Sequence, residues 1–508
     1  MKRALFCLLV FGGLFCAAQP PVQNKVDELV FKKQAETSFP PGELCSDSVF
    51  IRRVYLDVIG TLPSAADVRK FVADKSQKKR EKLIAELLSR PEFAEYWALK
   101  WGDLLRIKAE FPSNLWPNAV HAYHRWLRDA FRANMPFDEF ARALLTSSGS
   151  NFRDPPVNFY RPFQERSPRN LFEASALIFM GVRLENSGWT DEQIQRMCAF
   201  FEKVGYKGTD EWKEEIIFFD AQKTFSVAPA PVGGAPLNLT DTDDPRIAFT
   251  DWLTAPENPW FAQNIVNRIW FWLMGRGIIH EADDVRPGNP AWSPELLRFL
   301  ESELVKNKYD LQHIYKLILN SSTYQLSSIP TPANEKDEAG FSVYRVRRMP
   351  AEVLIDAICF VTATSEEYSS AVPEPFTFVP PSRRTIQLSD GSIKSPFLEM
   401  FGRPGRDSSL ESDRNDNVSV FQALHLLNSS HIRNKVMQSA KLRTQFANPP
   451  NGLTGVDMLY LSILSRYPEP EEKKVFDNYK KTSELTSDQA HYDLAWALIN
   501  SSEFLLKH

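Results

Sequence analysis

Three groups of charged side chains in this sequence have residue types that could perform catalysis or bind an anion. In the first group, Asn267, Arg268 and Trp270 precede Asp283 and Asp284. An arginine fork binds carboxylate or sulfate through two hydrogen bonds, and a tryptophan ring stacks on sugar rings, so this group predicts an anion or sugar site. The alternative is a buried ion pair of Arg268 with Asp283 or Asp284, because an unpaired guanidinium in so aromatic a stretch is costly.

The second group contains Arg348, Glu352 and Asp356, which are spaced four residues apart. On a helix this spacing places the three side chains on one face. Two carboxylates so placed could act as acid and base, and Glu352, Asp356 and Asp284 are the catalytic candidates. A salt-bridged helix surface is the alternative, because ladders of opposite charge are common on helices.

The third group lies in a glycine-containing loop that mixes both charges, and Arg403 and Arg414 are its candidate binding residues, with Arg348 from the second group. The loop could hold a cation or a partner, although the glycine and the terminal glutamate of a calcium-binding loop are missing. A solvated loop is the alternative. Whether the three groups meet in one cleft depends on the fold.

Other motifs of known chemistry are missing from the sequence. It has no G-x-S-x-G nucleophile elbow, no phosphate-binding loop, no H-E-x-x-H zinc motif and no C-x-x-C pair. His121 and His124 have the spacing of two metal ligands on a helix, but no neighbouring carboxylate completes a ligand set, and a solvated or packed pair is the alternative. We therefore predict no metal site and no cofactor, and an enzymatic function is not favoured.

Composition limits the classes of protein that the chain can belong to. Its 508 residues are 43% hydrophobic and 24% charged, which is ordinary for a soluble protein with a large core. The net charge of −4 is too balanced for a general nucleic-acid binder. Five cysteines are too few for a dense disulfide framework.

Helical periodicity dominates and predicts a mainly α fold with two helical domains. The first domain spans 24–223, a linker rich in Ala, Pro, Val and Gly spans 224–243, and the second domain spans 244–508. The proline-rich stretch 373–404 predicts an irregular, strand-containing insertion in the second domain. The helices expected in the first domain include one that follows a capping box at Ser64 and Asp67, and others at Lys79–Arg90, Ala119–Arg132 and Phe137–Thr146.

An internal similarity links the two ends of the chain. The segments 54–93 and 459–504 share an apolar-Tyr-Leu start, a following proline and a similar Ser-containing end that leads to Glu-Phe. This similarity predicts repeated helical units that pack on neighbouring units. The alternative is that helix ends simply reuse the same capping residues.

The N-terminus has the pattern of a secretory signal. Lys2 precedes an apolar run, 4–15, that is too short to span a bilayer, and small residues lead to a predicted cut after Ala18. Lipoprotein anchoring at Cys16 is the alternative, which bulky Phe15 argues against. We therefore expect an exported protein, periplasmic or extracellular, with no transmembrane segment after cleavage.

Several short motifs recur in the order of a known pair of domains. Those of the first half are Tyr55-Leu56-Asp57, Gly60-Thr61-Leu62-Pro63, Trp101-Gly102-Asp103-Leu104-Leu105-Arg106 and Asn134-Met135-Pro136-Phe137-Asp138. Those of the second half are Trp252-Leu253-Thr254, Asn267-Arg268-Ile269-Trp270, Phe401-Gly402-Arg403-Pro404 and Gln422-Ala423-Leu424-His425-Leu426-Leu427-Asn428-Ser429. Over nearly the whole chain the sequence resembles the planctomycete-type PSCyt domain followed by its usual companion, the PSD domain. The resemblance implies a secreted protein whose biochemical role is not established.

Two segments depart from the pattern of this family. Relatives carry a C-x-x-C-H-x-H type segment where this chain has Asn186–Asp191, and a C-E-C-E-R segment where it has Leu410–Arg414. The resemblance implies that the two thiol-bearing segments meet in relatives to form a metal or haem site. This chain lacks those thiols, so the resemblance does not imply a redox or haem function for it.

The function predicted from the sequence is that of a secreted, cofactor-free binding or scaffolding protein of the cell envelope. Its partner would be an envelope protein or a polysaccharide. The alternative is a hydrolase or lyase that acts on an extracellular polymer such as polysaccharide. In that case Asp284, Glu352 or Asp356 would supply the carboxylates, and Arg268 and Trp270 would bind the substrate.

Overall fold

The computed structural model describes residues 19–508, so the predicted signal segment lies outside the described residues. About 51% of the chain is helical and 4% is strand, which confirms the mainly α fold class. The first half contains α1 (Lys25–Thr37), α2 (Asp47–Val58), α3 (Ala65–Ala73), α4 (Lys79–Ser89), α5 (Pro91–Leu104), α6 (Pro117–Arg132), α7 (Phe137–Thr146), β1 (Gly149–Ser150), η1 (Pro155–Tyr160), α8 (Pro168–Met180), η2 (Leu184–Asn186), α9 (Asp191–Cys198), η3 (Ala199–Phe201), β2 (Val204–Gly208) and β3 (Glu215–Phe219). The second half contains α10 (Pro245–Thr254), α11 (Phe261–Met274), α12 (Pro294–Lys306), α13 (Leu311–Leu319), β4 (Arg347–Arg348), α14 (Ala351–Thr362), η4 (Thr385–Gln387), α15 (Pro396–Met400), η5 (Glu411–Asp413), α16 (Val420–Asn428), α17 (Ser430–Met437), α18 (Ala440–Ala447), α19 (Gly455–Ile463), α20 (Pro470–Thr482), α21 (Ser487–Ile499), α22 (Ser502–Leu505) and β5 (Leu506–Lys507).

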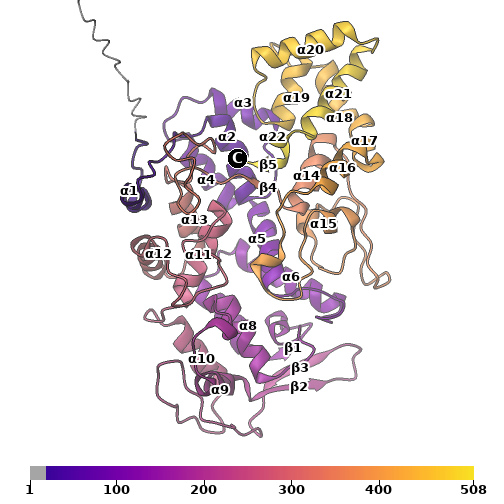
Figure 1. Cartoon of the computed structure of the whole chain (residues 1–508). Coiled ribbons are helices and arrows are strands. Elements are labelled where there is room, and N and C mark those ends of the chain that lie inside the picture. Colours follow the sequence, from indigo (N-terminus) through magenta and orange to yellow (C-terminus); the bar gives the residue numbers. More distant parts are fainter. Residues whose placement is uncertain (1–18) are drawn as a thin grey trace, which may run out of the picture.

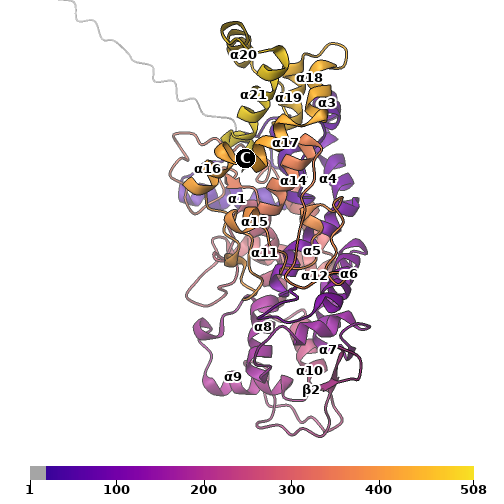
Figure 2. The same cartoon turned by 90° about the vertical axis from the view of Figure 1, so that its right-hand side faces the viewer.

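The molecule is elongated in both views of the ribbon. The C-terminal helices α18–α21 lie at one end, and α9 with the small β-sheet lies at the other (Figures 1 and 2). Between them, α5 of the first half packs on α11 of the second, where the ring of Trp272 lies 5.0 Å from that of Trp97 and 6.2 Å from that of Trp101. Because these rings are buried, one hydrophobic core continues from the first half into the second.

Helices of the first half form where the apolar period predicted them. Ser64 and Asp67 form the predicted capping box at the start of α3, since each side chain accepts a hydrogen bond from the backbone of the other. α7 has the predicted bounds, and α4 and α6 differ from theirs by one or two residues. In α6 the buried face includes Val120, Tyr123 and Leu127, which follow the three- and four-residue spacing of an amphipathic helix.

A small antiparallel sheet, in the order β1-β3-β2, was missed by the mostly helical prediction for the first half. β2 and β3 form a hairpin in which Tyr206 pairs with Ile217. In β3 only Ile217 is fully buried, because the sheet lies at the end of the molecule and has little core behind it. Five-residue strands with so weak an apolar pattern are hard to distinguish from a helix by periodicity.

The prediction of strands in the insertion 373–404 is wrong. Thr385–Gln387 forms the short helix η4, and no strand forms at 376–379. An isolated bridge pairs Ser369 with Lys394. Proline explains the difference, because it cannot donate to a strand ladder and several prolines interrupt this stretch. The two-region helical layout stands, and the exact domain bounds remain a prediction.

The N-terminal and C-terminal helices pack on each other, since α3 lies beside α19 in both views (Figures 1 and 2). The buried guanidinium of Arg52 in α2 donates to the carbonyl oxygens of Ile463 and Phe504 at 2.8 and 2.9 Å. These contacts fit the predicted repeat, in which helical units of similar sequence pack side by side.

Over residues 19–508, no helix combines the length and the apolar character that crossing a bilayer requires.

Candidate functional site

The three charged groups predicted from the sequence converge inside the molecule. They form a buried network of two ion-pair clusters where the loop that follows α15 packs between α5, α11 and α14. One cluster contains Asp103, Glu352, Arg406 and Arg414, and the other contains Arg268, Asp283 and Glu411. The charge of Lys100 interacts with members of both clusters.

Arg414 is the centre of one half of this network. Its guanidinium holds both carboxylate oxygens of Glu352, at 2.7 and 3.2 Å, and reaches Asp103 at 2.6 Å. The other oxygen of Asp103 accepts from Arg406 at 2.9 Å. Although burial of Glu352 opposes ionisation, Arg414 outweighs it and lowers the pKa of Glu352 to about 2. At neutral pH Glu352 is therefore a charged partner of Arg414.

Arg268 is the centre of the other half. It donates to Asp283 at 2.7 Å, which is the ion pair that the sequence offered as the alternative to an anion site. The second oxygen of Asp283 accepts the backbone N–H of Glu411 at 2.6 Å. The Glu411 carboxylate lies 3.8 Å from Arg268, and burial raises the pKa of Glu411. Asp283 and Glu411 therefore join the first predicted group to the third.

The two other catalytic candidates are separate from the network and from each other. Asp356 accepts the backbone N–H groups of Thr385 and Ile386 at 2.7 and 3.1 Å, so it caps the short helix η4. Burial raises the pKa of Asp356 more than these contacts lower it. Asp284 pairs with Arg286 at 2.9 Å. None of these carboxylates lines any of the cavities described below.

The candidate binding residues serve internal contacts. Asn267 donates to the carbonyl oxygen of Ile279 at 3.0 Å and accepts its N–H at 2.9 Å. Trp270 is 0% exposed, so no external ring can reach it. Arg348 donates to three backbone carbonyl oxygens, and Arg403 donates to that of Ile393. The predicted Arg348–Glu352 ladder is wrong, because Arg348 belongs to β4 and precedes the helix.

Sequence reasoning missed Asp103 and Lys100, which α5 contributes to the network. Burial lowers the pKa of Lys100, and Arg414 lowers it further. Both residues lie within two positions of the buried Trp101 in the same helix. The sequence did contain a signal for these two residues, because a carboxylate and an ammonium within so aromatic a helix are expected to need charged partners.

The predicted histidine pair is packed. His121 uses one ring nitrogen toward Ser389 at 3.0 Å and the other toward the carbonyl oxygen of Phe376 at 3.4 Å. His124 is buried, and burial lowers its pKa to about 3. Within residues 19–508, no three His, Cys, Asp or Glu side chains are grouped as a metal ion would require.

A cavity of about 540 Å³ borders the network, and we call it the seam cavity. Val182, Arg183 and Glu185 from the first half line it together with Ser408 and Leu410 from the second. The segments around Arg183 and around Ser408, from the two halves of the chain, therefore meet at this cavity. Arg106 closes one wall by donating to the Ser409 hydroxyl at 2.7 Å.

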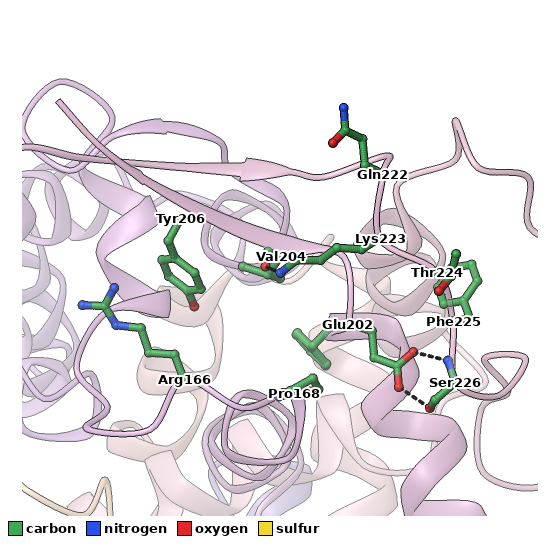
Figure 3. A pocket seen from close by; sticks show the side chains of 11 residues that line it. Arg166, Pro168, Glu202, Val204, Tyr206, Gln222, Lys223, Thr224, Phe225 and Ser226 are labelled. Carbon is green, nitrogen blue, oxygen red and sulfur yellow. Dashed lines mark hydrogen bonds between the residues drawn. The ribbon is translucent and has the colours of Figure 1, made fainter.

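Another cavity, of about 650 Å³, lies between β2 and the start of the linker (Figure 3). Most of its charged groups have internal partners. Glu202 accepts the N–H of Ser226 at 2.8 Å, Lys223 donates to the carbonyl oxygen of Val204 at 2.6 Å, and Arg166 pairs with Glu215 outside the view. This cavity therefore offers few free groups to a ligand.

Fold and network together define a helical protein of two regions joined by a continuous core and a buried ion-pair seam. The chain belongs to the planctomycete-type family that pairs two domains of unknown function. Residues 25–200 match PSCyt2, a protein of unknown function (DUF1549), and residues 245–480 match PSD1, a protein of unknown function (DUF1553). No curated protein and no solved structure matches the chain.

Proposed function

We propose that this protein is an exported, cofactor-free binding or scaffolding protein of the cell envelope. The proposal depends on one observation, which is that each of the three carboxylates predicted as catalytic candidates already has a partner within the protein. Arg414 holds Glu352, Arg286 holds Asp284, and backbone N–H groups hold Asp356. General acid–base catalysis needs a group that exchanges its proton beside the substrate, and these groups are committed to internal partners.

The placement of the charges also supports a binding role. A buried ion pair adds little net stability, but losing one partner is costly, so such pairs fix which surfaces meet. Here the pairs fix the loop that follows α15 against α5 and α11, and the seam cavity lies beside them. A preformed cavity between rigid walls is the usual setting of a binding site.

Binding without turnover is the property to test first. The purified protein is immobilised and incubated with solubilised envelope and with envelope polysaccharide from the producing cell, and both the retained material and newly formed reducing ends are measured. We expect stoichiometric retention with no new reducing ends. New ends that disappear in Glu352→Gln, while the variant remains folded, would instead favour the hydrolase or lyase alternative.

Export is tested separately. We expect the protein recovered from the periplasm or the medium to begin at Gln19, as determined by N-terminal sequencing of the mature chain. A full-length chain that stays in the cytoplasm would contradict the localisation and leave the binding result standing.

A further inference from the structure

A third cavity, of about 550 Å³, lies between the two regions on the side of α11 and α12. We call it the tryptophan pocket, because Trp189 from the first half and Trp260 from the second both line it. The proline-rich loop 285–291 and the buried side chains of Ile279 and Leu297 also line the pocket. Its volume falls within the range of about 300–1,000 Å³ that small-molecule sites occupy.

The two indole rings form a corner in this pocket. Their centroids are 5.7 Å apart and their planes make an angle of 86°. Both side chains are half-buried, and neither indole N–H donates to another group of residues 19–508. Each ring therefore combines an apolar surface with a free donor, which suits a ligand that is apolar on one face and polar at its edge.

Three further polar groups in the pocket have no internal partner. The carboxyl of Glu301 and the guanidinium of Arg298 lie three residues apart on α12, and the amide of Gln263 comes from α11. None of the three side chains makes an ion pair or a hydrogen bond with residues 19–508. Asn289 uses its amide nitrogen toward the carbonyl oxygen of Asp284 at 2.9 Å and keeps its amide oxygen free.

These free groups distinguish the tryptophan pocket from the buried network. Glu352 and Glu301 are both carboxylates in sheltered places, but Arg414 holds the first while the second has no partner. Burial accordingly raises the pKa of Glu301 to about 7, which lets its carboxyl both donate and accept near neutral pH. Because these side chains of the pocket are partly exposed and unpaired, a ligand rich in hydroxyls can replace their water with direct hydrogen bonds.

We propose that the tryptophan pocket binds a neutral sugar ring of a polysaccharide, stacked on one indole and hydrogen-bonded by Gln263, Asn289 and Glu301. The C–H face of a pyranose suits the ring surface, and its hydroxyls suit the amides and the carboxyl. A purely apolar ligand would leave those polar groups unpaired. A polyanionic sugar would find no excess of positive charge, because Glu301 lies beside Arg298 and Asp284 pairs with Arg286. This proposal deepens the binding function proposed above by naming its ligand class.

The test is isothermal titration of the purified full-length protein with cellohexaose, with chitohexaose and with hexagalacturonate. We expect one of the two neutral oligosaccharides to bind, and Trp189→Ala to weaken its binding at least tenfold. Trp212→Ala is the matched control, because Trp212 is 61% exposed and lies on the β2–β3 turn outside the pocket. This control should leave the affinity unchanged.

A second variant separates ligand contact from packing, because Trp189 also packs on Phe172 at 6.1 Å. Gln263→Ala removes only an unpaired amide, and it should weaken binding at least threefold at unchanged thermal stability. Saccharide binding that neither pocket variant changes would overturn the pocket assignment while leaving the binding function intact. The proposal also falls if neither neutral oligosaccharide binds, or if hexagalacturonate alone binds.

Discussion

Glu352→Gln tests whether the buried network is structural. The substitution keeps the shape of the side chain and removes the charge that Arg414 holds at 2.7 and 3.2 Å. A tenfold change in an equilibrium is worth about 1.4 kcal/mol, so lowering the pKa of Glu352 from 4.5 to about 2 corresponds to about 3 kcal/mol of folding free energy. That value matches the cost of about 3–5 kcal/mol for removing one partner of a buried ion pair.

The pH dependence of this loss has a definite sign. The folded-state pKa of Glu352 lies below the unfolded one, so its contribution to stability is complete above about pH 5 and is lost as the pH falls toward 2. We therefore expect Glu352→Gln to lower the free energy of unfolding by about 3 kcal/mol at pH 7, and by less than half of that at pH 3.

Urea unfolding followed by circular dichroism measures both values. Glu257→Gln is the matched control, because Glu257 is exposed and makes no ion pair within residues 19–508. The reasoning is refuted if the two variants unfold at the same urea concentration at pH 7. It is also refuted if the difference between Glu352→Gln and the natural protein is as large at pH 3 as at pH 7.

Three further changes probe other parts of the structure. Asp57→Asn should lower the free energy of unfolding by about 3–5 kcal/mol in urea titrations, because the buried ammonium of Lys507, which lies 2.8 Å from Asp57 in the natural protein, loses its counter-ion. Adding Lys507→Met should restore part of the loss. Glu301→Gln should raise the free energy of unfolding by about 1–2 kcal/mol at pH 8 and leave it unchanged at pH 4. A carboxyl whose pKa is raised to about 7 destabilises the fold only when it is ionised, and its partial exposure reduces this destabilisation. Trp97→Ala should lower the free energy of unfolding by about 3–5 kcal/mol, measured by calorimetry, because the Trp97 ring packs 5.0 Å from that of Trp272 across the junction of the two halves. A melting temperature equal to that of the natural protein would show that this contact does not join the halves.

Ion pairs between residues close in the sequence could be predicted, and ion pairs between distant residues could not. Arg268 and Asp283 are 15 residues apart, and one short connection brings them together. Glu352 and Arg414 are 62 residues apart, and Arg414 and Asp103 are 311 apart. No helical or strand period extends over such separations, so a charge can be recognised as needing a partner while the partner stays unknown.

The wrong ladder of Arg348 and Glu352 has a local cause that the sequence does contain. Pro350 stands between them, and the helix begins only at Ala351. Proline has a fixed φ and no N–H, so it favours the start of a helix and opposes its continuation from the preceding residue. The four-residue spacing was real, but the two residues do not belong to the same helix.

The fold was more predictable than the site because its signals are repeated. Each helix presents an apolar residue every three or four positions, and Val120, Tyr123 and Leu127 of α6 show how several positions agree on one buried face. The tryptophan pocket has no such redundancy. Trp189 and Trp260 contribute one residue each, and only the packing of α11 beside the first half brings them together.

Charged residues that stabilise the fold differ from residues that bind a ligand in whether they already have a partner within the protein. The conspicuous charges of this sequence, Arg268 and Arg414 among them, lie where carboxylates neutralise them, and such groups cannot change partner without a cost of several kcal/mol. Glu301 and Gln263 attract no notice in the sequence, yet they lie unpaired beside an aromatic corner. Since recognition requires groups that are free to exchange water for ligand, the unpaired residues of the tryptophan pocket are better candidates for binding than the paired residues of the network.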